Sequence, residues 1–124
     1  MIVDKYSTGY TFDIYVVLNP SKDELDKLFK WTKDDSSIYD ENNKKYTAYS
    51  CSGVTDKCNG EECFVVIVNS IGKDEPVIVS HEVFRITMDL LKILDIQYSE
   101  YSRDVYTYFR DYIAECIYKT ARKE

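Results

Sequence analysis

The sequence predicts an α+β fold in which a small three-stranded sheet packs on about three helices. Three observations support this prediction. Residues 63–69 are apolar almost throughout, which is typical of a strand buried on both faces. Two longer stretches, 76–96 and 102–122, repeat apolar residues every three or four positions, the period of an amphipathic helix. The length of 124 residues suits a single domain spanning residues 1–124.

The N-terminal part of the chain predicts one strand followed by one helix. Residues 10–18 alternate in polarity and are rich in β-branched and aromatic side chains, which indicates a strand that ends at an Asn-Pro pair. Ser21 and Glu24 have the spacing of a capping box, in which each side chain hydrogen-bonds the backbone N–H of the other residue. A helix of roughly ten residues is therefore predicted from Ser21 onward. Its apolar side is formed by Leu25, Leu28, Phe29 and Trp31.

The middle of the chain predicts a solvated loop and a β-hairpin. Residues 33–45 are polar and rich in acidic side chains, but they lack the D-x-D-x-D-G order of a calcium loop. A loop without a metal is therefore favoured. Residues 46–51 predict a short strand, which the turn-rich segment 52–62 connects to the apolar strand 63–69. These two strands are predicted to pair as a hairpin with a long loop.

The segment 76–96 is the longest apolar-periodic stretch and predicts the central helix. Pro76 suits its first turn, because the N–H that proline lacks has no partner there in any case. A broad apolar stripe is predicted to face the core, formed by Val79, Val83, Ile86, Leu90, Ile93 and Leu94. The last predicted helix, 102–122, has a similar stripe formed by Val105, Phe109, Tyr112, Ile113, Cys116 and Ile117.

The charge and composition exclude some classes of function. A net charge of −6 argues against a surface that binds nucleic acid. No apolar run reaches the roughly 18–20 residues of a membrane span, so no membrane partner is expected. The N-terminus does not resemble a signal peptide, and a cytoplasmic location is therefore expected. Twelve tyrosines are unusual for this length and leave open a recognition surface.

The four cysteines are expected to be free thiols in a reducing cytoplasm. Cys51, Cys58 and Cys63 lie around the predicted hairpin, but their spacing lacks the paired C-x2–4-C of a zinc ribbon. A structural zinc or a disulfide among these three is the less favoured interpretation. Cys116 falls on the apolar stripe of the last helix and is expected to serve packing.

The only histidine of the chain opens a sequence that resembles a zinc motif. His81 is followed by Glu82, as in H-E-x-x-H, where two histidines one helical turn apart bind zinc and the glutamate polarises the metal-bound water. In this chain Arg85 holds the position of the second histidine. A lone histidine near a helix start is more often a structural or an exposed residue than a ligand.

Three segments together resemble small zincin-like proteins encoded by bacteriophages. They are residues 79–85 with the His-Glu pair, the amphipathic continuation 90–96, and residues 102–108. In that family an acidic residue before an Ala-Tyr-Ala-Tyr-like segment supplies the third zinc ligand, and Asp104 stands at that place here. The resemblance implies a minimal zincin-like fold, a substrate bound along the edge strand just before the metal-binding helix, and His81 and Asp104 as metal ligands.

The chain departs from the family pattern at two of the ligands. Arginine stays protonated and offers no lone pair, so Arg85 cannot replace a histidine ligand. Asp104 replaces a glutamate, and aspartate can still bind zinc. We expect instead that Arg85 pairs with Asp104, with Glu82 or Asp89 as a second partner, so that an ion pair joins two helices that zinc would otherwise join. The other interpretation is a surface Arg85 that contacts only Asp89, one turn along.

The expected function is that of a degenerate zincin-like pseudoenzyme without a metal cofactor. It would bind a protein or peptide partner through Arg85, Asp89 and Asp104. The resemblance implies a phage origin, a host or virion protein as partner, and the host cytoplasm as location. One alternative is an active zinc peptidase with Glu82 as general base, His81 and Asp104 as ligands, and a further ligand such as Asp89 or a cysteine. A second alternative is a small structural or assembly protein.

Overall fold

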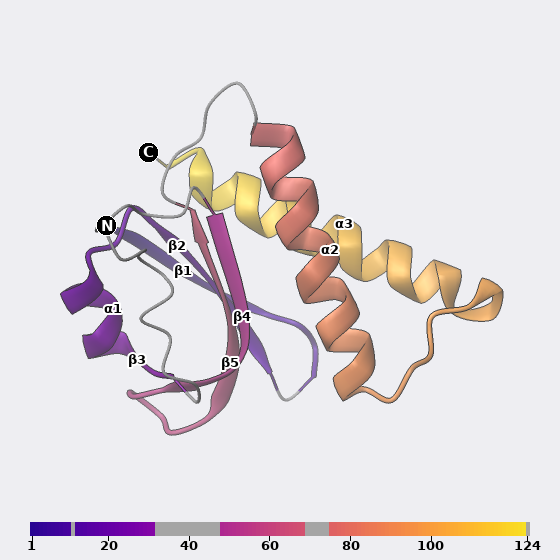
Figure 1. Ribbon diagram of the computed structural model, residues 1–124, viewed down its shortest axis with the longest axis horizontal. Coiled ribbons are helices and arrows are strands. Elements are labelled where there is room, and N and C mark those ends of the chain that lie inside the picture. Colours follow the sequence, from indigo (N-terminus) through magenta and orange to yellow (C-terminus); the bar gives the residue numbers. More distant parts are fainter. Residues whose placement is uncertain (11, 32–47, 69–74, 124) are drawn as a thin grey trace, which may run out of the picture.

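The computed structural model describes residues 1–10, 12–31, 48–68 and 75–123. Within this part of the chain a five-stranded mixed sheet has the strand order β1-β2-β5-β4-β3. The strands are β1 Ile2–Ser7, β2 Asp13–Leu18, β3 Phe29–Lys30, β4 Ala48–Asp56 and β5 Glu62–Val68. The helices are α1 Lys22–Leu28, α2 Glu75–Ile93, the short 3-10 helix η2 Glu100–Ser102 and α3 Arg103–Ala121. Figure 1 shows α2 and α3 crossing each other on one side of the sheet, away from α1.

The centre of the sheet is the parallel pair of β2 and β5. β1 pairs antiparallel with β2, and β4 pairs antiparallel with β5 and with the short β3. Six consecutive residues of β5, 63–68, are buried because both faces of this strand are covered. The predicted apolar strand and its pairing with the preceding strand are thus confirmed, but β4 extends to Asp56, so residues 52–56 belong to the strand and not to the predicted long loop.

Two hydrophobic cores lie on opposite faces of the sheet, since successive side chains of a strand point to opposite sides. The larger core joins the sheet to α2 and α3, and its fully buried members include Ile14, Phe64, Ile86, Leu90 and Ile113. The smaller core lies under α1 and β3, and it includes Val17, Leu25, Phe29 and Val65. The helical pair α2–α3 therefore presents its outer face, opposite the larger core, to solvent.

The C-terminal half of α3 is fastened to the edge strand β1 by a polar network. The Thr120 hydroxyl donates to Asp4 Oδ2 at 2.9 Å and lies 2.6 Å from the Tyr6 hydroxyl oxygen. Lys123 Nζ donates to Asp4 Oδ1 at 2.8 Å. One face of α3 thus has hydrogen-bonded partners on a strand that is more than a hundred residues away in sequence.

The predicted α+β class and the positions of the main helices are confirmed, but the sheet has five strands and not three. Strand β1 was not predicted. The predicted first helix ends at Leu28, and Phe29 begins β3, so Phe29 and Trp31 pack from the sheet side of the smaller core. The capping box of Ser21 and Glu24 is present. The predicted loop 33–45 lies outside the described residues.

Two details of the helices also differ from the prediction. Ile93 is 42% exposed, and the place it was given in the core is taken by Leu91, which is 1% exposed. Val105, also predicted to be buried, is 38% exposed because it lies near the free end of α3. None of the helices described in the structure is long and apolar enough to cross a membrane.

Candidate functional site

The residues of the zinc-like motif diverge on α2 instead of converging. His81 and Arg85 lie one turn apart on the exposed side of the helix, and 68% of the His81 side chain is exposed. Glu82 points elsewhere and is buried, with 6% of its side chain exposed. Its Oε1 is 4.0 Å from His81 Nε2, and its buried Oε2 accepts no hydrogen bond from any residue that the structure describes. Glu82 is therefore a carboxylate held inside the fold and turned away from the exposed side.

The predicted internal bridge from Arg85 to Asp104 is wrong. Both residues are exposed, and the ion pairs that join described residues do not include one between them. Neither Glu82 nor Asp89 is ion-paired with Arg85 in that set. The reason lies in how the two helices meet. Their contact includes apolar and aromatic side chains such as Phe84 and Tyr106, and Arg85 and Asp104 lie on the solvent side of their helices.

The pairing of α2 with α3 also separates His81 from Asp104. Val79 and Ser80 share a groove with Ala114 and Tyr118, so His81 lies beside the C-terminal half of α3. Asp104 is ten residues or more from that level, which corresponds to about 15 Å along a helix that rises 1.5 Å per residue. The two predicted ligands are therefore not brought together. Among the described residues, no group of three or more His, Cys, Asp or Glu side chains is arranged to hold a metal ion.

The strand that precedes α2 also differs from the expected arrangement. β5 is flanked by β2 and β4, so it is a central strand and has no free edge for a substrate. The expectation of an edge strand just before the central helix is wrong for this reason.

No disulfide joins the four cysteines to one another in the described part of the chain. Burial raises the pKa of Cys63 to about 12, and the nearby Asp56 carboxylate acts in the same direction. Burial likewise raises the pKa of Cys116 to about 11. Both side chains are buried and remain protonated at neutral pH, which suits packing and not nucleophilic chemistry. Cys58 is exposed in the turn between β4 and β5.

An aromatic patch, formed by Phe84, Tyr98 and Tyr106, joins α2, the segment before η2, and α3. The ring centroids of Phe84 and Tyr106 are 6.4 Å apart, and those of Tyr98 and Tyr106 are 5.0 Å apart, both edge to face. Phe84 and Tyr98 are each 52% exposed. Edge-to-face rings hold one another in place, so these side chains form a fixed surface that is only partly covered.

Most of the exposed large apolar side chains lie in the part of the sequence that contains this patch. Eight large hydrophobic residues are exposed among the described residues, and six of them fall between positions 84 and 108. Those six are Phe84, Ile93, Tyr98, Tyr101, Val105 and Tyr108. Tyr101 is 98% exposed and makes almost no contact that would explain its place in the fold.

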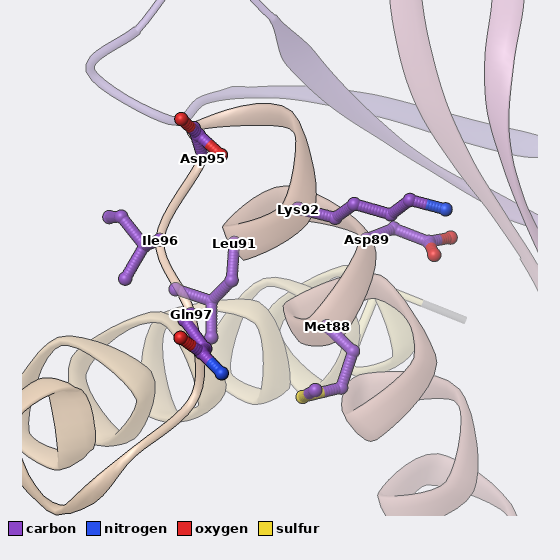
Figure 2. A pocket seen from close by; sticks show the side chains of 7 residues that line it. All are labelled: Met88, Asp89, Leu91, Lys92, Asp95, Ile96 and Gln97. Atoms are coloured by element: carbon purple, nitrogen blue, oxygen red, sulfur yellow. The ribbon is translucent and has the colours of Figure 1, made fainter.

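Two concave features border the patch. The α2–α3 groove has a volume of about 190 Å³ and is lined by Val83, Phe84, Tyr106, Ala114 and Tyr118, among others. Arg110 stands at its rim, where Nε and Nη2 donate to Asp111 Oδ1 at 3.1 and 3.0 Å. The second feature, which we call the α2 hollow, has a volume of about 670 Å³ and lies at the C-terminal end of α2. Figure 2 shows the seven residues that line it: Met88, Asp89, Leu91, Lys92, Asp95, Ile96 and Gln97.

The hollow owes its shape to the way α2 ends. Ile96 N donates to Leu91 O at 2.8 Å and Asp95 N donates to Lys92 O at 3.1 Å, the paired hydrogen bonds of a Schellman motif. Asp95 has φ = +57°, the left-handed conformation that glycine usually supplies at this position. The motif reverses the chain and folds Ile96 and Gln97 back along the helix (Figure 2). Of the predicted binding residues, Asp89 lines the α2 hollow, whereas Arg85 and Asp104 line neither of these two features.

No family model, no curated protein and no solved structure matches this chain. The function is therefore inferred from the aromatic patch and from the residues that line the α2–α3 groove and the α2 hollow.

Proposed function

We propose that this chain is a protein-binding module that recognises its partner through the aromatic patch and the two concave features beside it. The observation that carries the proposal is that Phe84 and Tyr98, each about half exposed, are held by contacts with Tyr106 at the junction of α2 and α3. Soluble proteins seldom expose large apolar residues side by side unless another molecule covers them. Tyrosine and arginine are also the residues enriched where protein partners bind most tightly.

The packing of the patch favours binding over a purely structural role. Phe84, Tyr98 and Tyr106 contact one another, but the larger core already contains enough buried side chains to join α2 and α3 to the sheet. Half of the Phe84 surface remains in water after folding. Covering such surface with a partner is worth roughly 25 cal/mol per Å² of apolar area.

The same proposal includes a degenerate zincin-like origin, in which metal binding and hydrolysis have been lost. Two features support it. Arg85 holds a ligand position with a group that cannot coordinate a cation. His81 lies beside a part of α3 well separated from Asp104, so the pair supplies no common ligand site. A partner from a phage host or from a virion fits this proposal.

Site-specific photo-crosslinking tests the proposed function. A photoreactive phenylalanine analogue is placed at Phe84 in one variant and at Cys58 in another, and each protein is irradiated in extract of its native cells. Cys58 is exposed in the turn of the β4–β5 hairpin, away from the aromatic patch. We expect the variant at position 84 to give discrete adducts that the variant at position 58 does not give.

A second substitution makes this test specific for the patch. Tyr98→Ala, added to the variant at position 84, removes a neighbouring ring and should abolish the adducts, whereas Tyr10→Ala should leave them unchanged. Tyr10 is a matched control because it is 53% exposed and contacts α3 through Phe109, away from the α2–α3 groove. Identical adducts from positions 84 and 58 would contradict the proposal. Adducts that consist only of a second copy of this chain would identify an assembly protein instead.

A further inference from the structure

The α2 hollow combines an apolar floor with a charged rim. Met88, Leu91 and Ile96 supply the apolar walls. Asp89 and Asp95 supply carboxylates, and Figure 2 shows them at different sides of the hollow, Asp89 with the Lys92 side chain and Asp95 on the returning segment. A volume of about 670 Å³ is well above what a single side chain of a partner needs.

The two carboxylates of the hollow have no ion-pair partner among the described residues. The four ion pairs of this part of the chain involve other acidic residues, namely Asp13, Glu82, Asp111 and Asp4. Lys92 is on the same rim but lies beyond ion-pair distance of both carboxylates. Two carboxylates and one ammonium leave the hollow with a formal charge of −1, and the whole chain carries −6. Both the local and the overall field attract a cation.

The hollow is continuous with the aromatic patch. Ile96 and Gln97 line the hollow, and the next residue in the chain, Tyr98, stacks edge to face on Tyr106 of the patch. Met88 of the hollow lies one turn beyond Phe84 of the patch on α2. A bound segment that fills the hollow with one side chain therefore lays its neighbouring side chains on the rings.

We propose that the α2 hollow receives a lysine or arginine side chain from a basic, apolar segment of the partner protein. The aliphatic stem would lie on Met88 and Ile96, while the cationic head meets one of the two carboxylates, Asp89 or Asp95, which stand at different sides of the hollow. Long basic side chains bury their methylene groups on apolar surface in this way and keep the charge near polar groups. The apolar residues next to the cation contact the aromatic patch. This inference rests on the proposed function and names the chemistry of the partner.

The test uses two blocked peptides of sequence Leu-Arg-Leu-Trp, one with arginine and the other with citrulline at the second position. Citrulline has nearly the shape of arginine but carries no charge. Each peptide is titrated into ¹⁵N-labelled protein, and the backbone amide shifts give the site and the affinity. We expect shifts in residues 84–98, with binding of the citrulline peptide weaker by about fivefold or more.

Isosteric variants assign this difference to the hollow. In Asp89→Asn/Asp95→Asn the two peptides should bind alike, because the carboxylates that distinguish them are gone. Asparagine accepts the left-handed conformation of position 95 about as well as aspartate does, so the end of α2 is kept. Asp104→Asn is the control: it removes one exposed carboxylate from α3 outside the hollow, and the preference for arginine should persist.

Three results would overturn the inference: equal affinity of the two peptides for the unmodified protein, a preference for arginine that survives in Asp89→Asn/Asp95→Asn, or no shifts in residues 84–98. None of these affects the crosslinking at position 84, so the proposed function stands or fails separately. If the adducts at position 84 depend on Tyr98 but the peptides bind alike, the patch is the recognition surface and the hollow takes no cation.

Discussion

The two halves of α3 are built for different tasks. The C-terminal half lies over the sheet, where Ile113 and Ile117 are buried and Thr120 is tied to Asp4 of β1. The N-terminal half extends beyond the sheet, as Figure 1 shows, and carries Tyr108, which is 66% exposed; Tyr101 of η2, just before it, is 98% exposed. The helix is continuous from Arg103 to Ala121, so its packed half holds the projecting half in place.

This contrast separates residues that stabilise the fold from residues that are available to a partner. A helix of this length in water is stable mainly because of the tertiary packing of one face. Here most of that packing comes from Phe109 onward, and the exposed ring of Tyr108 contributes little to it. The difference predicts that substitutions in the two halves affect different properties, stability in one and binding in the other.

The largest expected effect is on stability in the packed half. Ile113 is fully buried in the larger core, and Ile113→Ala should lower the free energy of unfolding by about 2–5 kcal/mol, since it removes buried methyl groups and leaves a cavity. Tyr108→Ala, in the projecting half, should change it by less than about 0.5 kcal/mol. Urea denaturation followed by far-UV circular dichroism measures both. If both variants lost the same amount of unfolding free energy, the two halves of α3 would not differ in their contribution to stability.

A smaller effect is expected from the network that fastens α3 to β1. The hydrogen bond from Lys123 lowers the pKa of Asp4, and the hydrogen bonds from Thr120 and Tyr6 act in the same direction. The Asp4 side chain is 19% exposed, and Asp4→Asn should lower the free energy of unfolding by about 1–2 kcal/mol at pH 7. Because the folded state holds Asp4 ionised, its contribution is present above about pH 4 and is lost as the pH falls through the lowered pKa.

Denaturation at two pH values tests this interpretation. The difference in the free energy of unfolding between the native chain and Asp4→Asn should be largest at pH 7. It should shrink at a pH below the lowered pKa of Asp4. Asp111→Asn serves as the control, since 66% of the Asp111 side chain is exposed and it should have little effect at either pH. A difference that is the same at both pH values would show that the charge of Asp4 is not what stabilises the junction.

The smallest effect is expected at the border of the hollow. Asp95 is in the left-handed conformation at the end of α2, where glycine carries no side-chain penalty. Asp95→Gly should therefore raise the stability by up to about 1 kcal/mol, and Asp95→Asn should leave it nearly unchanged. Thermal unfolding measures both variants. A loss of stability in Asp95→Gly would mean that the carboxylate has a structural task in the free protein.

The elements with a strong local period could be predicted from the sequence. The apolar run of β5 and the three-to-four spacing of α2 and α3 reflect burial within each element. Strand β1 could not be found in this way, because none of its residues is fully buried and it is held by pairing with β2. The short β3 was hidden because Phe29 continues the apolar pattern of α1 although the backbone has already become extended.

The site was harder to predict than the fold, because it depends on how two helices cross. Residues 81, 85 and 104 were expected to converge on the basis of their order in the chain. Their separation follows from how the two helices cross, because Ser80 of α2 shares a groove with Ala114 and Tyr118 near the C-terminal end of α3. The spacing of residues within one helix does not reveal this crossing. The sequence carried one hint of the aromatic patch, the concentration of tyrosines in residues 98–108. Asp89 was identified as a binding residue, but its predicted partner was Arg85 and its actual surroundings are the hollow.

Whether the partner covers the aromatic patch is tested most directly by hydroxyl-radical footprinting of the tyrosines. The labelling is compared with and without the partner captured at position 84. Exposed rings are labelled, and a ring covered by a partner is not. The account predicts that Tyr98 and Tyr101 lose their labelling in the complex while Tyr10, with the same exposure as Tyr98 to within a per cent, keeps it. Protection of Tyr10 with continued labelling of Tyr98 and Tyr101 would place the partner elsewhere and contradict the account.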